Sequence, residues 1–206
     1  MIAILNNLKE ILEIHIPRDA LSYCLDLSQK HKFNFKLYSN RKTKIGDYKY
    51  DPATKNSQIS VNRSLNSYSF LITFIHEIAH LVATKTFGRK IAPHGKEWKS
   101  TFKQLMLPLI IPDIFPENLL RTLAKHLINP KASTHADPVL VRALQAYDMQ
   151  RDGFKQLDRI GNGNYFSFNG KRFQYLEKRR TRIVCRQVSN DKKYLVAGTT
   201  LVAELD

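Results

Sequence analysis

Residues 70–98 read FLITFIHEIAHLVATKTFGRKIAPHGKEW. Apolar side chains recur in the first part of this stretch every three or four residues, the spacing of one buried helix face. They are Phe70, Leu71, Phe74, Ile75, Ile78, Leu81 and Val82. The pattern predicts a long helix that begins after Asn66 or Ser67, both good N-cap residues, and ends at Phe87 before a glycine.

The sequence around this helix predicts an α+β fold. Helical spacing is expected at four further places, residues 18–31, 94–107, 117–128 and 138–149. The last of these begins with a proline after an aspartate cap, a favourable helix start. Alternating apolar and polar residues predict three short strands, at 33–37, 44–50 and 58–62. Their short connections predict a small antiparallel sheet.

The composition changes near residue 158, where glycines and alternation replace helical spacing. The dipeptide Asn169-Gly170 is a strong hairpin signal. We therefore expect two domains, a larger one over residues 1–157 and a small all-β module of four or five strands over residues 158–206.

The overall charge is strongly positive. Lys and Arg number 33 against 18 Asp and Glu, which gives a net charge of +15. Such an excess favours an anionic partner, most simply nucleic acid, although a basic surface can also serve solubility alone. The two cysteines, Cys24 and Cys185, are far apart, so their number excludes a disulfide framework and a cysteine zinc ribbon.

Neither a secretory signal nor a membrane helix is expected. The first 17 residues contain two glutamates and lack a basic segment followed by an unbroken apolar one. The apolar run of residues 105–112 is much shorter than the ~20 residues of a membrane helix. We therefore expect a cytoplasmic protein without membrane contact.

The polar residues of the long helix form the motif HExxH. His76 and His80 are four residues apart and so lie one turn apart on one helix face, where two imidazoles can bind one zinc ion. Glu77 can then reach a metal-bound water and take its proton as the water attacks a carbonyl group. The alternative is two hydrogen-bonded histidines without metal. Burying such groups on an apolar helix is costly unless they are paired, which favours the metal site.

A catalytic zinc ion takes three protein ligands and keeps one position open. The pattern HExxHxxGxxH would place the third ligand at position 86, but this residue is Thr86. The candidate is His94, fourteen residues after His80, and Glu97 is its rival one helical turn further on. No local pattern marks the remaining histidines, which are His15, His31, His126 and His135.

Residues 76–102, HEIAHLVATKTFGRKIAPHGKEWKSTF, are similar to the core of the SprT-like family. That family joins HExxH to a later histidine followed by glycine and by an aromatic residue three positions after the glycine. These residues are His94, Gly95 and Trp98 here. Upstream, IGDYKYDPATKNSQISVNRSL resembles the strand pair that precedes the active helix of the family, so the resemblance extends over about residues 15–107.

The resemblance implies a zincin-like metallopeptidase domain in which His76, His80 and His94 bind zinc and Glu77 is the catalytic base. The resemblance to Spartan, a eukaryotic member of the family, implies that the substrates are proteins bound to DNA. Many bacterial relatives carry a C-terminal zinc ribbon, which this chain cannot form, so a DNA-binding role does not follow from those relatives.

The C-terminal module is basic. Residues 151–206 contain 12 Lys or Arg and 6 Asp or Glu. Basic strands with interleaved aromatic residues suit single-stranded nucleic acid, but the aromatic side chains can equally form the core and the arginines a solvated face. The candidate contacts are Lys178, Arg179, Arg180, Arg182 and Arg186.

Two functions remain from the sequence. The first is a zinc-dependent endopeptidase that acts on protein or peptide substrates, in particular DNA-associated proteins. The second is a nucleic-acid-binding adaptor with a structural zinc ion and little or no proteolysis. Glu77 favours the enzyme, because a structural zinc site needs no base beside its first ligand. The sequence does not determine the oligomeric state.

Overall fold

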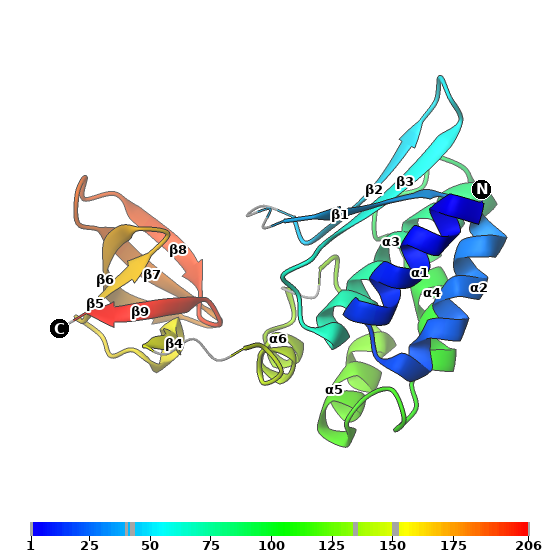
Figure 1. Cartoon of the computed structure of the whole chain (residues 1–206). Helices are drawn as coiled ribbons and strands as arrows, with labels where there is room; N and C mark the ends of the chain where they lie inside the picture. The colour runs from blue at the N-terminus through cyan, green and yellow to red at the C-terminus, as the bar shows by residue number, and fades with distance from the viewer. Residues whose placement is uncertain (1, 40, 42–43, 134–135, 150–152, 206) are drawn as a thin grey trace. The chain divides into compact units, whose positions relative to one another are not determined.

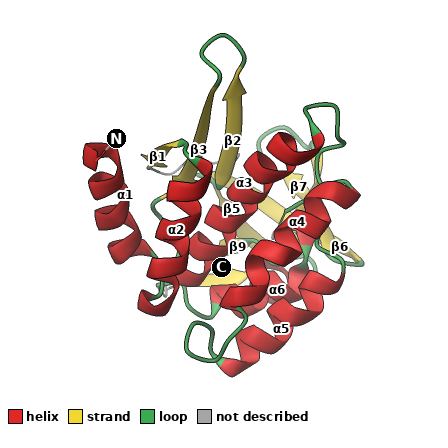
Figure 2. Cartoon of the chain, turned by 90° about the vertical axis from the view of Figure 1, so that its right-hand side faces the viewer, coloured by secondary structure: helices red, strands yellow, loops and turns green. Residues whose placement is uncertain are grey.

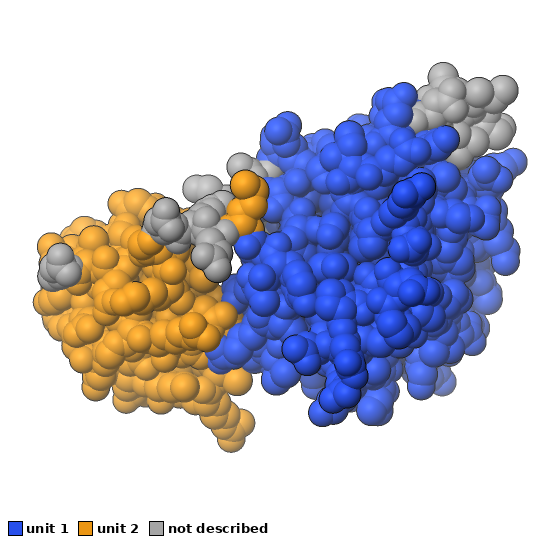
Figure 3. Space-filling view, turned by 60° about the horizontal axis from the view of Figure 1, so that its bottom comes forward, with its two compact units in different colours: residues 1–148 blue, residues 149–206 orange. Residues whose placement is uncertain are grey.

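The computed structural model describes residues 2–39, 41, 44–133, 136–149 and 153–205, with residues 2–6 described by their backbone alone. The chain divides into two compact units, residues 1–148 and 149–206 (Figure 3). The boundary lies before the predicted position at residue 157, because residues 154–156 form a strand of the second unit. The chain is α+β, as the sequence predicted.

Unit 1 combines a small sheet with helices that lie on one side of it (Figures 1 and 2). Its strands are β1 (Asn34–Tyr38), β2 (Gly46–Asp51) and β3 (Asn56–Asn62). Its α-helices are α1 (Ile2–His15), α2 (Leu21–His31), α3 (Ser67–Phe87), α4 (Lys96–Met106), α5 (Glu117–Ile128) and α6 (Pro138–Gln145). Helix α1 has no counterpart among the predicted elements.

The sheet of unit 1 is mixed, so the predicted antiparallel sheet is wrong. The strand order is β1-β3-β2, with β3 parallel to β1 and antiparallel to β2. Since β1 and β2 lie on opposite sides of β3, these consecutive strands do not form a hairpin. Alternation in a sequence identifies a strand but does not say which strand lies beside it.

Helix α3 is the centre of the core. Its N-cap is Asn66, whose side chain accepts a hydrogen bond from the Ser69 backbone N–H at 2.9 Å. Phe70 and Phe74 are fully buried, and both pack against the ring of Phe35 on β1. The predicted bounds of this helix are confirmed, and its packing holds the HExxH turn rigidly beneath the sheet.

Helix α6 begins at Pro138 after the Asp137 cap, as predicted, but it ends four residues early at Gln145. The N–H groups of Tyr147 and Asp148 bond to carbonyl groups three residues back, so the helix tightens into a turn there.

Unit 2 contains one six-stranded sheet in the order β4-β9-β5-β6-β7-β8, with antiparallel neighbours throughout. Its strands are β4 (Phe154–Gln156), β5 (Tyr165–Phe168), β6 (Lys171–Arg179), β7 (Arg182–Gln187), β8 (Lys193–Ala197) and β9 (Leu201–Leu205). Asn169 and Gly170 both have positive φ between β5 and β6, which confirms the predicted two-residue turn. Phe166, Ile183 and Val202 form the centre of its core.

No helix in the described ranges combines the length and the apolar character needed to cross a membrane.

Candidate metal centre

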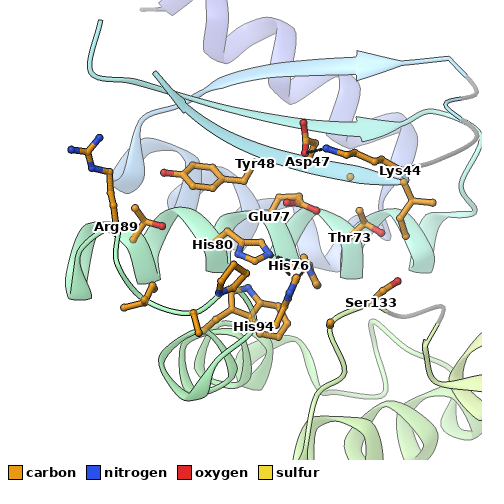
Figure 4. Close-up of a pocket in the computed structure, with 18 residues that line it drawn as sticks. Lys44, Asp47, Tyr48, Thr73, His76, Glu77, His80, Arg89, His94 and Ser133 are labelled. Carbon is orange, nitrogen blue, oxygen red and sulfur yellow. Dashed lines mark hydrogen bonds and ion pairs between the residues drawn. The ribbon is translucent and has the colours of Figure 1, made fainter. Parts of the chain in front are cut away.

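Three imidazole rings of unit 1 converge on one point. His76 and His80 project from neighbouring turns of α3, and His94 comes from the loop before α4 (Figure 4). The Nε2 atoms lie 3.1 Å apart in the pair His76–His94, 3.2 Å in His76–His80 and 3.0 Å in His80–His94. The structure therefore brings the three predicted ligands together, and this group can hold a metal ion.

Hydrogen bonds among the rings cannot satisfy this arrangement. Each neutral imidazole nitrogen either carries a proton and donates or lacks one and accepts. Among three mutually close Nε2 atoms, at least two must both carry a proton or both lack one. At least one of the three contacts is therefore repulsive. A cation bound to three unprotonated nitrogens removes the conflict. Zinc with Zn–N bonds of about 2.0–2.1 Å in tetrahedral geometry separates its ligands by about 3.3 Å, close to the spacing found here.

The protonation states suit a metal. Burial lowers the pKa of His76 to about 2, with smaller contributions from His80 and His94. Burial likewise lowers the pKa of His80 to about 4, with a smaller contribution from the nearby His94. Burial also lowers the pKa of His94. All three rings are therefore neutral near pH 7 and keep a lone pair for coordination.

A tight turn presents His94. The Gly95 N–H donates to the Ala92 carbonyl at 2.9 Å, and Pro93 and His94 occupy the two central positions. His94 has a positive φ of 57°, and the third position of a type II turn requires a positive φ, while proline is favoured at its second position. The local sequence thus directs this imidazole toward α3 immediately before α4 begins.

Trp98 forms the wall behind the three ligands. Its side chain is 1% exposed, and its ring centroid lies 4.6 Å from that of His76, 5.3 Å from His80 and 4.7 Å from His94. The ring stacks on Phe102 at 5.0 Å. The packing restricts the rotation of each imidazole, so the site is pre-organised before any ion binds.

Glu77 lies between the histidines and strand β2 (Figure 4). It is 7% exposed. Burial raises the pKa of its carboxyl group to about 8, and Asp47 adds to the increase, whereas Arg41, Lys44 and a hydrogen bond from the Tyr48 backbone N–H oppose it. Glu77 is therefore a stronger base than an exposed glutamate and is not one of the three converging groups.

The metal centre opens into a cavity of about 650 Å³. Its walls come from β2, α3, the loop before α4 and the loop after α5. Tyr48 extends over this space with its ring parallel to that of His80, 6.4 Å between centroids. Lys44, Arg89 and Ser133 also line the cavity, and no sequence motif marks them, because they come from separate loops.

The rival ligand, Glu97, does not join the histidines. It lies in the first turn of α4, with a carboxylate oxygen 3.9 Å from the Lys96 ammonium group. His126 is buried and bonded to Asp137, which is a structural role. His135 lies outside the described residues.

The basic residues of unit 2 separate into two places. Lys178, Arg179, Arg180 and Arg182 are exposed around the hairpin that joins β6 to β7. Arg179 pairs with Glu177. Arg186 lies further along β7, where it donates to the Gln174 side-chain oxygen at 2.7 Å and lies 3.6 Å from Asp191. Arg186 is therefore engaged by partners within the unit, whereas the other four predicted contacts lie at the hairpin.

An α+β domain with three converging histidines on and beside its central helix is a candidate metal-binding domain. Residues 19–113 match the sequence model of the SprT-like family. This segment of the chain belongs to that family, as its motif predicted.

Curated relatives named Protein SprT support the assignment. The chain is 42% identical over 66 residues to the protein of Proteus mirabilis, which is 30% of this chain and 36% of the relative. It is 57% identical over 35 residues to that of Escherichia coli K12, which is 16% of this chain and 21% of the relative. The chain thus spans well under half the length of these relatives. No solved structure matches the chain.

Proposed function

We propose that this protein is a zinc-dependent endopeptidase. The observation that carries the proposal is the convergence of three neutral imidazoles at 3.0–3.2 Å, beside the buried carboxyl group of Glu77 and in an open cavity. These are a ligand set and a general base placed where a peptide can reach both. The family supports a metallopeptidase-like role in outline.

His76, His80 and His94 would hold the metal through Nε2. A bound zinc ion supplies a Lewis acid that polarises a carbonyl group and acidifies water. Glu77 accepts a proton from the attacking water at its carboxylate and returns it to the nitrogen of the leaving amine. Burial strengthens Glu77 as a proton acceptor because it raises the pKa of the carboxyl group, and a bound zinc cation would favour the ionised form that accepts the proton.

The free edge of β2 would bind the substrate. Among the described strands, β3 alone pairs with β2, and β2 lines the cavity. The Ile45 carbonyl accepts a hydrogen bond from the Asn62 N–H at 2.8 Å, so the backbone groups of Ile45 face β3. Successive residues of a strand turn their backbone N–H and C=O groups to opposite sides, so those of Gly46 and Tyr48 face away from β3. An extended peptide can pair with such an edge. We therefore expect flexible or unfolded segments to be cleaved in preference to folded ones.

DNA-associated proteins are the proposed substrates. The exposed Arg180 and Arg182 of the unit 2 hairpin, together with the net charge of +15, would attract nucleic acid and concentrate the enzyme near proteins bound there. The function as an adaptor with a structural zinc is less well supported. Structural zinc sites have four protein ligands, whereas three converge among the described residues.

The test is cleavage of casein by zinc-loaded protein, with and without single-stranded DNA, beside Glu77→Gln at equal zinc content. We expect cleavage that DNA stimulates and that Glu77→Gln abolishes. Cleavage indifferent to DNA would retain the peptidase and refute the link to DNA. Zinc binding and DNA binding without cleavage of casein or of DNA-bound proteins would instead support the adaptor.

A further inference from the structure

Strand β2 comes closest to helix α3 at Gly46. A Cβ atom at this position would lie 2.5 Å from Oε1 and 3.0 Å from Cγ of Glu77. It would also lie 2.6 Å from Cγ2 of Thr73. Thr73 and Glu77 are one turn apart on α3, so the backbone of β2 fits into the space between these two side chains.

Backbone conformation does not explain the glycine. Gly46 is not among the residues of positive φ in the described part of the chain, and any amino acid could adopt its extended conformation. The requirement is therefore the absence of a side chain, which permits the close approach of a strand to a helix.

The close approach serves the carboxylate. The place where a Cβ atom of residue 46 would stand is closest to Oε1 of Glu77, so the backbone of β2 packs directly against the carboxylate at this crossing. We propose that Gly46 is a positioning residue for Glu77, because the missing side chain lets the backbone of β2 pack on the Glu77 side chain and hold its carboxylate beside the three histidines. The inference rests on the proposed function only in taking Glu77 as the base.

The surroundings of Gly46 determine which neighbouring side chain moves when a Cβ atom is added at this position. Thr73 is 3% exposed, and its hydroxyl donates to the Ser69 carbonyl at 2.7 Å, which restrains its rotation. Glu77 has three side-chain torsions and ends at the open cavity. Gly46→Ala should therefore displace the Glu77 carboxylate more readily than it unfolds the domain.

The first measurement compares casein cleavage by zinc-loaded wild-type protein, Gly46→Ala and the control Gly161→Ala. A Cβ atom at position 161 meets nothing closer than 3.5 Å. We expect Gly46→Ala to lose about 100-fold in kcat with KM and zinc content nearly unchanged, as for a base misplaced by about 1 Å. Gly161→Ala should retain wild-type kcat. Full activity of Gly46→Ala would overturn the proposal.

The second measurement is independent of activity. Crystal structures of the zinc-loaded proteins should show the Glu77 carboxylate displaced from its wild-type position in Gly46→Ala and unmoved in Gly161→Ala. An unmoved carboxylate in Gly46→Ala would overturn the positioning role. If the variants show this pattern but the wild type cleaves nothing, the proposed peptidase fails while the positioning of Glu77 stands.

A double variant covers the case in which Gly46→Ala is too unstable. Thr73→Ser removes the Cγ2 atom and retains the hydroxyl group. Gly46→Ala with Thr73→Ser should regain much of the lost thermal stability and still lack cleavage, with the Glu77 carboxylate displaced. Recovery of cleavage in this double variant would assign the defect to Thr73 and contradict the inference.

Discussion

The Nδ1 atom of His126 lies 2.8 Å from the Oδ2 atom of Asp137. His126 is buried on α5, and Asp137 is the N-cap of α6, so one carboxylate joins two helices. The loop between these residues includes Ala132 and Ser133, which line the metal cavity. The pair therefore fixes both ends of one cavity wall.

Replacing this carboxylate should destabilise unit 1. We expect Asp137→Ala to lower the free energy of unfolding by about 2–3 kcal/mol, because it removes a helix cap and leaves the buried His126 without its partner. Asp137→Asn is the control, since asparagine caps equally well and should cost less. Urea unfolding followed by the fluorescence of Trp98, the one tryptophan of the chain, reports on unit 1. Wild-type stability of Asp137→Ala would contradict the structural role of this pair.

Removing the metal should also destabilise unit 1. We expect one zinc ion per chain and a fall in the melting temperature on chelation, because an ion present at about 1,000 times its dissociation constant contributes about 4 kcal/mol. His94→Ala should lose the ion and the stabilisation. Glu97→Ala should retain both. Loss of zinc from Glu97→Ala, measured by elemental analysis, would instead favour Glu97 as a ligand.

Acid should destabilise the metal-free protein. Burial lowers the pKa of His76 to about 2 and of His80 to about 4, below the ordinary value near 6.5 that applies to the unfolded chain. The unfolded chain therefore binds more protons below about pH 6.5, and the free energy of unfolding falls as the pH is lowered toward about 4. The decrease should be smaller in His80→Gln. Identical pH profiles of the two apo proteins would contradict the burial effect.

The hairpin of unit 2 should contribute to nucleic-acid affinity. We expect Arg180→Ala with Arg182→Ala to weaken binding of single-stranded DNA and to reduce the slope of log affinity against log salt by about 1.4, or about 0.7 for each lost phosphate contact. Lys30→Ala with Lys36→Ala, exposed on unit 1, is the charge-matched control. Equal effects of the two double variants would indicate attraction by net charge alone.

The sequence predicts the central helix well, because three requirements agree there. The apolar spacing, the Asn66 cap and the glycine after Phe87 define the same element, and the structure begins and ends it at the predicted residues. The pairing of β1 with β3 escapes prediction, since strand order depends on contacts between distant segments that alternation does not record.

The candidate metal site likewise has one part that the sequence predicts and another part that it does not. HExxH places two imidazoles by helical geometry alone, whereas His94 and Glu97 remain rivals until the turn of Ala92–Gly95 is known. Pro93 is the local signal for that turn, and the positive φ that follows it orients His94. The closeness of Gly46 to Glu77 has no sequence signal, because it arises where two elements cross in space.

The open edge of β2 also bears on solubility. An edge that can accept a peptide can equally accept the same edge of another molecule, the first step toward aggregation. Lys49 and Asp51 are exposed on this strand, and Lys44 precedes it. Charged side chains there discourage a second copy from pairing in register. Replacing them with apolar residues to tighten substrate binding would remove a safeguard against self-association.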